Sequence, residues 1–237
     1  MKYDIKKTHD KKEIISRWYK TFGIDFVYEK NISQKNNVRQ ESTHPRQDCD
    51  FQNLDELRSF IMESDLCNLK NTSRNTVFSD GDPKSKIMII GEAPGQEEDI
   101  QGKPFVGQSG QLLNNMLLSV GISREDVYIS NIVFWRPPGN RTPSNEEISI
   151  CLPYVQKHIE FISPKVLLLL GSVSIRAILN SSLPISKLRG KKTMYNNIIV
   201  IPSFHPAYLL RSPNQKSLAF LDMIELKKCL TKENPEI

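Results

Sequence analysis

Four short, mainly apolar runs separated by segments of helical periodicity constrain the fold of this chain more than any other feature. They span residues 86–90, 127–133, 166–170 and 198–201. Runs of this kind are typical of strands buried on both faces of a parallel sheet. The sequence therefore predicts an α/β fold: a three-layer sandwich around a central, mostly parallel, four-stranded sheet, with ligand chemistry at the carboxyl ends of the strands.

The intervals between these runs have the apolar spacing of helices. Helices are expected over about 54–62, 110–118, 145–161, 172–179 and 216–230. A further short helix is predicted between Ile14 and Phe22, and the polar stretch 31–50 is expected to be a flexible linker. We therefore predict two parts: an N-terminal extension over 1–50 and a main domain over 51–237.

Bulk properties narrow the class of protein further. No apolar run approaches the roughly 18 residues of a membrane span, and the N-terminus has no signal-peptide core, so a cytoplasmic protein with no membrane association is expected. The four cysteines lie far apart and form no disulfide framework or Cys-x-x-Cys metal site. The net charge of +5 permits a polyanionic partner without requiring one. No extra apolar helix is evident, so a monomer is expected.

Two glycine-rich turns follow the first predicted strand, G-E-A-P-G-Q-E-E-D over 91–99 and G-K-P-F-V-G-Q-S-G over 102–110. Glycine lets backbone amides approach a ligand closely, which indicates an anion or base site, although turns at strand ends also need glycine for geometry alone. The spacing is not that of a P-loop or a dinucleotide motif. Among the crowded carboxylates at least one is expected to have a function, whereas Glu97 is interpreted as solvated.

The next strand carries Asn131 near its carboxyl end. A buried Asn offers an acceptor and a donor pair that match the edge of uracil and mismatch cytosine, although an Asn that caps a turn is an alternative. Arg136 and Arg141 then flank a Pro-Pro-Gly turn. This loop suits a phosphate clamp, and it also suits a structural loop whose arginines pair with Asp or Glu.

The last motif, S-F-H-P-A-Y-L-L-R over 203–211, places His205 in a proline-stiffened turn after the final strand. A lone His is more often structural. Beside Tyr-Leu-Leu-Arg, however, it fits a loop that inserts into the DNA minor groove.

Taken together and in this order, these motifs resemble those of the family-4 uracil-DNA glycosylases over about residues 54–230. The resemblance implies the fold of that superfamily and an enzyme of base excision repair. Such an enzyme hydrolyses the N-glycosidic bond of deoxyuridine in DNA, releases uracil and leaves an abasic site. Its partner would be uracil-containing DNA, single- or double-stranded.

The resemblance also assigns roles to individual residues. Glu92 and Glu98 would position or activate water or stabilise the cationic sugar, and His205 would donate a hydrogen bond to the uracil O2. Phe105 would stack on the flipped base and Asn131 would select uracil, in a pocket formed by Gly91, Ala93, Pro94, Gly95, Phe105 and Asn131. DNA contacts would come from Arg136, Arg141, Ala207, Leu209, Leu210 and Arg211, of which the leucines and Arg211 would fill or brace the gap left in the duplex.

The chain departs from the family at the four positions that match its iron–sulfur ligands, which here are Ser64, Cys67, Trp135 and Cys151. Serine is a poor cluster ligand and tryptophan is none, so we expect no cluster and no other cofactor.

Two alternative functions stay open from the sequence. The first is a catalytically weak relative that binds uracil-DNA, against which the intact His205, Asn131 and carboxylates argue. The second is a nucleotide-binding or partner-binding module linked to DNA replication, the latter through residues 1–50.

Overall fold

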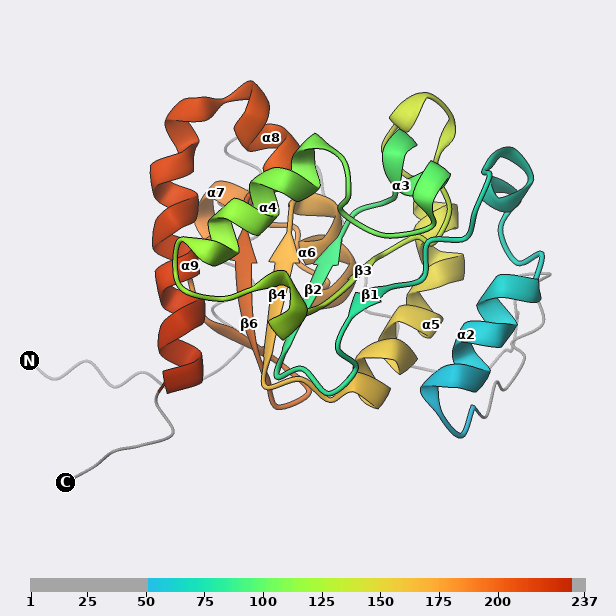
Figure 1. Ribbon diagram of the computed structural model, residues 1–237, viewed down its shortest axis with the longest axis horizontal. Helices are drawn as coiled ribbons and strands as arrows, with labels where there is room; N and C mark the ends of the chain where they lie inside the picture. Colours follow the sequence, from blue (N-terminus) through green and yellow to red (C-terminus); the bar gives the residue numbers. More distant parts are fainter. Residues whose placement is uncertain (1–50, 232–237) are drawn as a thin grey trace, which may run out of the picture. The chain divides into compact units, whose positions relative to one another are not determined.

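The computed structural model describes residues 51–231, and Figure 1 shows strands in the middle of this part with helices around them. The strands are β1 (Asp80–Gly81), β2 (Ile87–Gly91), β3 (Tyr128–Asn131), β4 (Val166–Leu170), β5 (Thr193–Tyr195) and β6 (Ile198–Ser203). The α-helices are α2 (Leu54–Glu63), α3 (Gln96–Gln101), α4 (Gln108–Leu118), α5 (Asn145–Ile162), α6 (Ser172–Leu179), α7 (Ile185–Leu188), α8 (Pro206–Arg211) and α9 (Lys216–Thr231). Short 3₁₀ helices are η1 (Asn68–Thr72), η2 (Arg124–Asp126), η3 (Pro138–Asn140) and η4 (Pro213–Gln215). The helix and linker predicted within 1–50 lie outside the described residues.

Within the described residues, six strands form one sheet in the order β1-β3-β2-β4-β6-β5. The four central strands are parallel to one another and are the four that the sequence predicts, whereas β1 and β5 pair antiparallel at the two edges. The prediction of a four-stranded sheet was therefore incomplete, because it did not include the edge strands β1 and β5. With two and three residues, these strands are too short to show an apolar periodicity.

The strand order creates a switch point at the carboxyl ends of the central strands. β2 pairs with β3 on one side and with β4 on the other, so the chain switches direction across the sheet at β2. Ligands of open α/β sheets bind outside the carboxyl ends of the strands at such a switch point. The paired registers bring together Gly91 with Asn131 and Leu170 with Ser203 at this edge.

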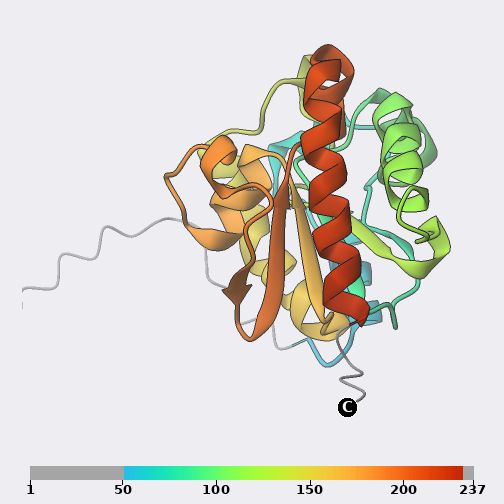
Figure 2. The same cartoon turned by 90° about the vertical axis from the view of Figure 1, so that its left-hand side faces the viewer.

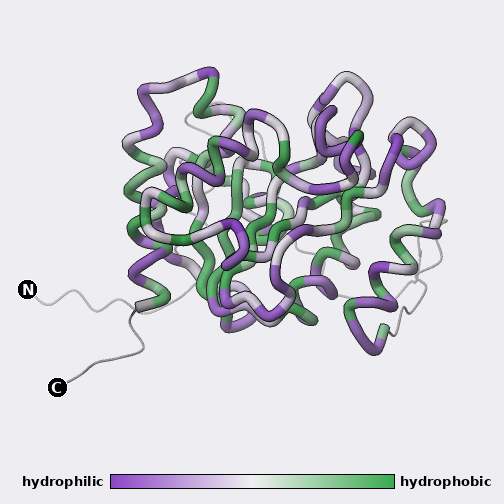
Figure 3. Tube along the Cα trace, in the orientation of Figure 1, coloured by the Kyte–Doolittle hydropathy of each residue, from purple (hydrophilic) through white to green (hydrophobic). Residues whose placement is uncertain are grey.

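Alternate residues of the central strands enter two separate cores. Met88 and Ile90 of β2 pack with buried residues of α2, α5 and α6, whereas Ile87 and Ile89 pack with those of α4 and α9. Figure 2 shows α9 running along its face of the sheet, and Figure 3 shows hydrophobic segments concentrated in the central strands. The predicted three-layer arrangement is confirmed because each strand face is covered by helices. Within the described part, no helix is long and apolar enough to cross a membrane.

Helix α5 begins directly after the arginine loop, and its start anchors that loop. The Ser144 hydroxyl accepts the Glu147 amide at 3.1 Å, and the Glu147 carboxylate accepts the Ser144 amide at 2.7 Å. This reciprocal pair is a capping box, which fixes where the helix starts. The same carboxylate also receives a guanidinium from the loop, as described below.

Candidate active site

The carboxyl ends of the central strands and the turns after them surround one cleft of about 880 Å³. Many residues of the sequence-predicted site line it, although they come from separate stretches of the chain. They are Glu92, Ala93, Pro94, Gly95, Glu98, Phe105, Asn131, Arg141, His205, Ala207 and Arg211. The switch-point topology therefore brings three of the sequence motifs and part of the arginine loop to one place.

Gly91 lies at the end of β2, just behind the wall of the cleft. A Cβ atom at this position would lie 2.4 Å from Asn131 Oδ1 and 2.6 Å from the Phe105 ring. Distances below 3 Å are not tolerated without displacement of a neighbour. The absence of a side chain at Gly91 is thus what allows the amide and the aromatic ring to share one side of the cleft.

Glu98 joins the two glycine-rich turns. Its carboxylate accepts hydrogen bonds from the backbone amides of Gly95 at 3.1 Å, Val106 at 2.9 Å and Gly107 at 2.9 Å. A carboxylate held by three amides has a fixed orientation. Glu98 therefore fixes the shape of the cleft wall, whichever further part it plays.

Asn131 presents an unsatisfied acceptor at the end of β3. The residue is 1% exposed, lines the cleft, and its Oδ1 has no hydrogen-bond partner. An unpaired buried acceptor costs roughly 1–3 kcal/mol in stability, so such atoms are rare without a reason. A ligand that donates a hydrogen bond into the cleft would remove this cost.

His205 caps helix α8 and is held as a neutral imidazole. Its Nδ1 accepts the backbone amide of Ala207 at 3.2 Å, so the ring proton resides on Nε2. Burial lowers the pKa of His205 to about 4; the charge of Arg211 also lowers it and that of Glu98 opposes the shift. At neutral pH the side chain is therefore an uncharged N–H donor in the cleft, 5.5 Å from the Phe105 ring between centroids.

Glu92 is the half-buried carboxylate of the cleft. Burial raises its pKa above the ordinary value of 4.5, while a hydrogen bond with Thr142 and the charge of Arg176 act in the opposite direction. Sequence reasoning missed both partners because they lie about 50 and 80 residues away along the chain. A partly buried carboxylate with a raised pKa is suited to general-base chemistry.

The two arginines of the Pro-Pro-Gly loop are engaged within the protein. Arg141 donates both terminal nitrogens to the Glu147 carboxylate at 2.8 and 2.6 Å, and it remains 47% exposed at the side chain. Arg136 donates Nε to Asn140 Oδ1 at 2.7 Å and lies 4.0 Å from Asp99. Their predicted DNA contacts stay predictions, and the structural alternative weighed for this loop describes the contacts they make here.

Two neighbouring leucines of helix α8 differ in their exposure to solvent. Leu210 is 41% exposed, whereas Leu209 is fully buried in a small core with Phe204 and Ala219. The prediction that Leu209 contacts DNA directly needs correction, because a side chain with no exposed surface cannot enter a duplex in this arrangement. Leu209 supports the loop from inside, and Leu210 is the exposed apolar residue.

Several residues that line the cleft lie outside the sequence motifs, among them Gly171, Ser172, Ile185, Ser186 and Gln215. Gly171 is the one that could have been found, because it directly follows a predicted strand. Its φ is +93°, and a Cβ there would lie 3.1 Å from the His205 Cβ. Glycine at this position leaves room for the imidazole.

The residues at the four presumed cluster positions do not fit a four-thiolate cluster. The Cys67 and Cys151 thiols are buried and hydrogen-bonded to each other, which lowers the pKa of Cys67 to about 7 and raises that of Cys151. Ser64 Oγ is buried without a partner, and the fully buried Trp135 donates its indole N–H to Thr76 at 2.9 Å. Over residues 51–231, no group of three or more His, Cys, Asp or Glu side chains is placed to hold a metal ion.

The family model of the uracil DNA glycosylase superfamily matches residues 78–226, and the mostly parallel sheet with a cleft at its switch point is consistent with that fold. Several relatives, among them the following three, are named type-4 uracil-DNA glycosylases. That of Thermotoga maritima is 41% identical over 73% of this chain and 92% of its own length, and that of Saccharolobus solfataricus is 39% identical over 76% and 87%. The Archaeoglobus fulgidus protein is 36% identical over 79% and 98%. This chain belongs to the type-4 uracil-DNA glycosylases.

Proposed function

We propose that this protein excises uracil from DNA by hydrolysing the N-glycosidic bond of deoxyuridine, the first step of base excision repair. The observation that carries the proposal is the buried, unpaired Oδ1 of Asn131, a residue that lines the cleft. It can accept the N3–H of uracil while the amide nitrogen donates to O4. Cytosine presents a lone pair at N3 and a donor at its exocyclic nitrogen, so it would meet the Asn131 amide with the wrong polarity.

The chemistry assigned to His205 follows from its protonation state. Cleavage of the glycosidic bond leaves negative charge on the departing uracil, and a fixed N–H donor aimed at O2 stabilises that charge. The Nδ1 contact with Ala207 holds the proton on Nε2, where it can be donated. A neutral imidazole with a pKa of about 4 stays in this form throughout the neutral range.

Glu92 would act on the sugar side of the bond. The departing base leaves a sugar with oxocarbenium character, which a carboxylate stabilises while it also activates the attacking water. Glu98, with three backbone amides on its carboxylate, would serve by holding the cleft in shape. Phe105 would stack on the uracil and offset part of the energy spent in unstacking it from DNA.

Uracil must leave the duplex to reach this cleft. The exposed Leu210 would fill the gap that the base leaves, and Ala207 and Arg211, which line the cleft, would contact the DNA backbone. Extrusion costs least from single strands and from mismatches, so these are the favoured substrates. We further propose that the protein acts in the cytoplasm as a monomer.

The proposal is tested with end-labelled oligonucleotides that carry one uracil, single-stranded or opposite guanine. We expect alkali-sensitive breaks at uracil and none at thymine or cytosine in matched strands. Tight binding to the uracil strand without breaks would instead support the catalytically weak relative. If the protein neither binds the uracil strand nor breaks it, the uracil assignment as a whole is contradicted.

Asn131→Asp is expected to change base selectivity. The substitution removes the amide N–H that would donate to uracil O4. Uracil excision should therefore fall about 10- to 100-fold, which corresponds to the cost of leaving a buried hydrogen-bonding group unpaired. The carboxylate can accept the exocyclic amine of cytosine, so breaks at cytosine should appear. The measurement compares both bases in one sequence context. Asn131→Ala is the control, and it should lose uracil excision without gaining cytosine.

We also propose that the enzyme works without an iron–sulfur cluster. Two of the four ligand positions are Ser64 and Trp135, and the buried indole fills space with apolar atoms instead of a thiolate. Protein purified without oxygen should therefore contain far less than four irons per chain, and chelators should leave its uracil excision and melting temperature unchanged. Brown protein with about four iron and four sulfide per chain would contradict the proposal.

A further inference from the structure

The turn that carries Phe105 is held in an unusual conformation next to the cleft. Phe105 has a φ of +52°, in the left-handed region that residues other than glycine rarely adopt. The residue is 5% exposed and lines the cleft. Something in the surrounding structure must hold this backbone, because a free turn would relax to a more common conformation.

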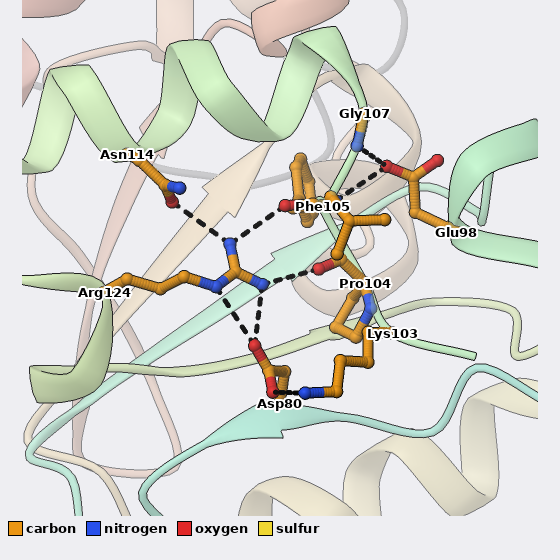
Figure 4. Close-up of polar contacts among 9 residues, drawn as sticks. Asp80, Glu98, Lys103, Pro104, Phe105, Gly107, Asn114 and Arg124 are labelled. Atoms are coloured by element: carbon orange, nitrogen blue, oxygen red, sulfur yellow. Dashed lines mark hydrogen bonds and ion pairs between the residues drawn. The ribbon is translucent and has the colours of Figure 1, made fainter. Parts of the chain in front are cut away.

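Two charged side chains hold the turn from opposite sides, as Figure 4 shows. The Glu98 carboxylate accepts hydrogen bonds from the backbone amides of Val106 and Gly107. Arg124, which belongs to η2, donates hydrogen bonds to the backbone carbonyl oxygens of Pro104 at 2.7 Å and Phe105 at 2.9 Å. Four consecutive residues thus have a main-chain polar group fixed by an ionised side chain.

Arg124 has no hydrogen-bonding capacity left for another task. A guanidinium has five N–H donors. Two of them go to the carbonyls, two to Asp80 at 3.0 and 2.8 Å, and one to Asn114 at 3.1 Å. Its side chain is only 18% exposed. Such a fully engaged fork fixes its partners in direction as well as in distance.

Close packing explains why this anchor sets the position of the ring. A Cβ at Gly110 would lie 1.9 Å from the Phe105 carbonyl oxygen, so the start of α4 presses directly against this peptide. The carbonyl is therefore enclosed between the helix and the guanidinium. A shift of this peptide would rotate the ring that forms one wall of the cleft.

We propose that Arg124 is a positioning residue for uracil excision, which sets the Phe105 ring for stacking by holding the carbonyls of Pro104 and Phe105. The inference rests on the proposed function. It assigns Arg124 a role in base binding through Phe105, in contrast to a role confined to joining the β1 edge strand to the fold through Asp80.

A double-mutant cycle tests the proposal. We expect Arg124→Gln to lower kcat/KM for a single-stranded uracil oligonucleotide by about 10- to 100-fold and to weaken inhibition by free uracil, because misplacing a substrate-contacting group by about 1 Å has effects of this size. Phe105→Ala should have a similar effect. The variant with both changes should be no worse than Phe105→Ala alone, within about twofold.

Two further variants keep the test decisive. Lys103→Gln removes an exposed cation 3.7 Å from the same Asp80 without touching the carbonyls, and it should leave excision unchanged. If Arg124→Gln does not fold, Arg124→Lys replaces it, because lysine keeps a charge beside Asp80 and lacks the fork. Independent, multiplying effects of the two changes in an active enzyme would overturn the role of Arg124. A wild-type protein that releases no uracil would instead contradict the proposed function.

Discussion

Glu92→Gln should lower the rate of uracil release by about 10²–10⁴-fold, the range typical for loss of a positioned general base. Glutamine keeps the size of the side chain and loses the charge that stabilises the cationic sugar and activates water. Binding of uracil-containing DNA should change little, because the effect lies in the transition state. Single-turnover rates and binding isotherms measured on the same preparation separate the two. A loss below about tenfold would remove Glu92 from the chemistry.

The activity of the wild-type enzyme should be lost at acidic pH because Glu92 becomes protonated. Glu92 must be ionised, and its pKa is raised above the ordinary 4.5, so activity is present above that raised pKa and is lost as the pH falls through it. Burial lowers the pKa of His205 to about 4, so the imidazole stays neutral at neutral pH. Thr142→Val removes a hydrogen bond that lowers the Glu92 pKa, so the acid limb should move to higher pH. Thr142→Ser, which keeps a hydroxyl, should leave the limb in place.

His205→Ala should lower uracil release by about 10²–10³-fold, as expected when one preorganised donor to a developing anion is removed. His205→Gln restores an N–H donor without the ring and should recover part of the loss. The effect should be smaller with substrates whose leaving base is more acidic, such as 5-fluorouracil, because less charge stabilisation is needed. Equal losses for uracil and 5-fluorouracil would indicate that His205 supports the fold and does not stabilise the leaving base.

The control for His205→Ala is the stability of the variant. The imidazole caps α8 through Ala207, so its removal should destabilise the loop by about 0.5–2 kcal/mol, the usual cost of a lost cap. Thermal unfolding measures this cost directly. A loss of activity that disappears when the variant is assayed well below its melting temperature would assign the effect to stability.

The central strands could be predicted from the sequence because they are buried on both faces, which makes them mainly apolar. Strands β1 and β5 could not, since two or three residues at a sheet edge have no such pattern. The motif residues at strand ends were found because parallel topology sends all four ends to one edge. Their glycines and single polar groups stand out against the apolar runs that precede them.

The contacts that fix these residues were beyond the reach of sequence reasoning. Arg124 lies in an ordinary-looking stretch, and only the fold brings it to the Phe105 carbonyl, 19 residues away along the chain. Thr142 and Arg176 reach Glu92 in the same way. Leu209 and Leu210 are chemically identical neighbours, and only helix α8 decides that one is buried and the other exposed.

Uracil excision by this chain is tested most directly by mass spectrometry of a uracil-containing oligonucleotide after incubation with the purified full-length protein. We expect free uracil and an abasic strand in which a hydroxyl group from water replaces the base, so that the strand is lighter by the mass of uracil less that of one water. Both products should be suppressed in Glu92→Gln and His205→Ala. An unaltered oligonucleotide after incubation with excess wild-type protein would contradict the assignment of a uracil-DNA glycosylase activity to this chain.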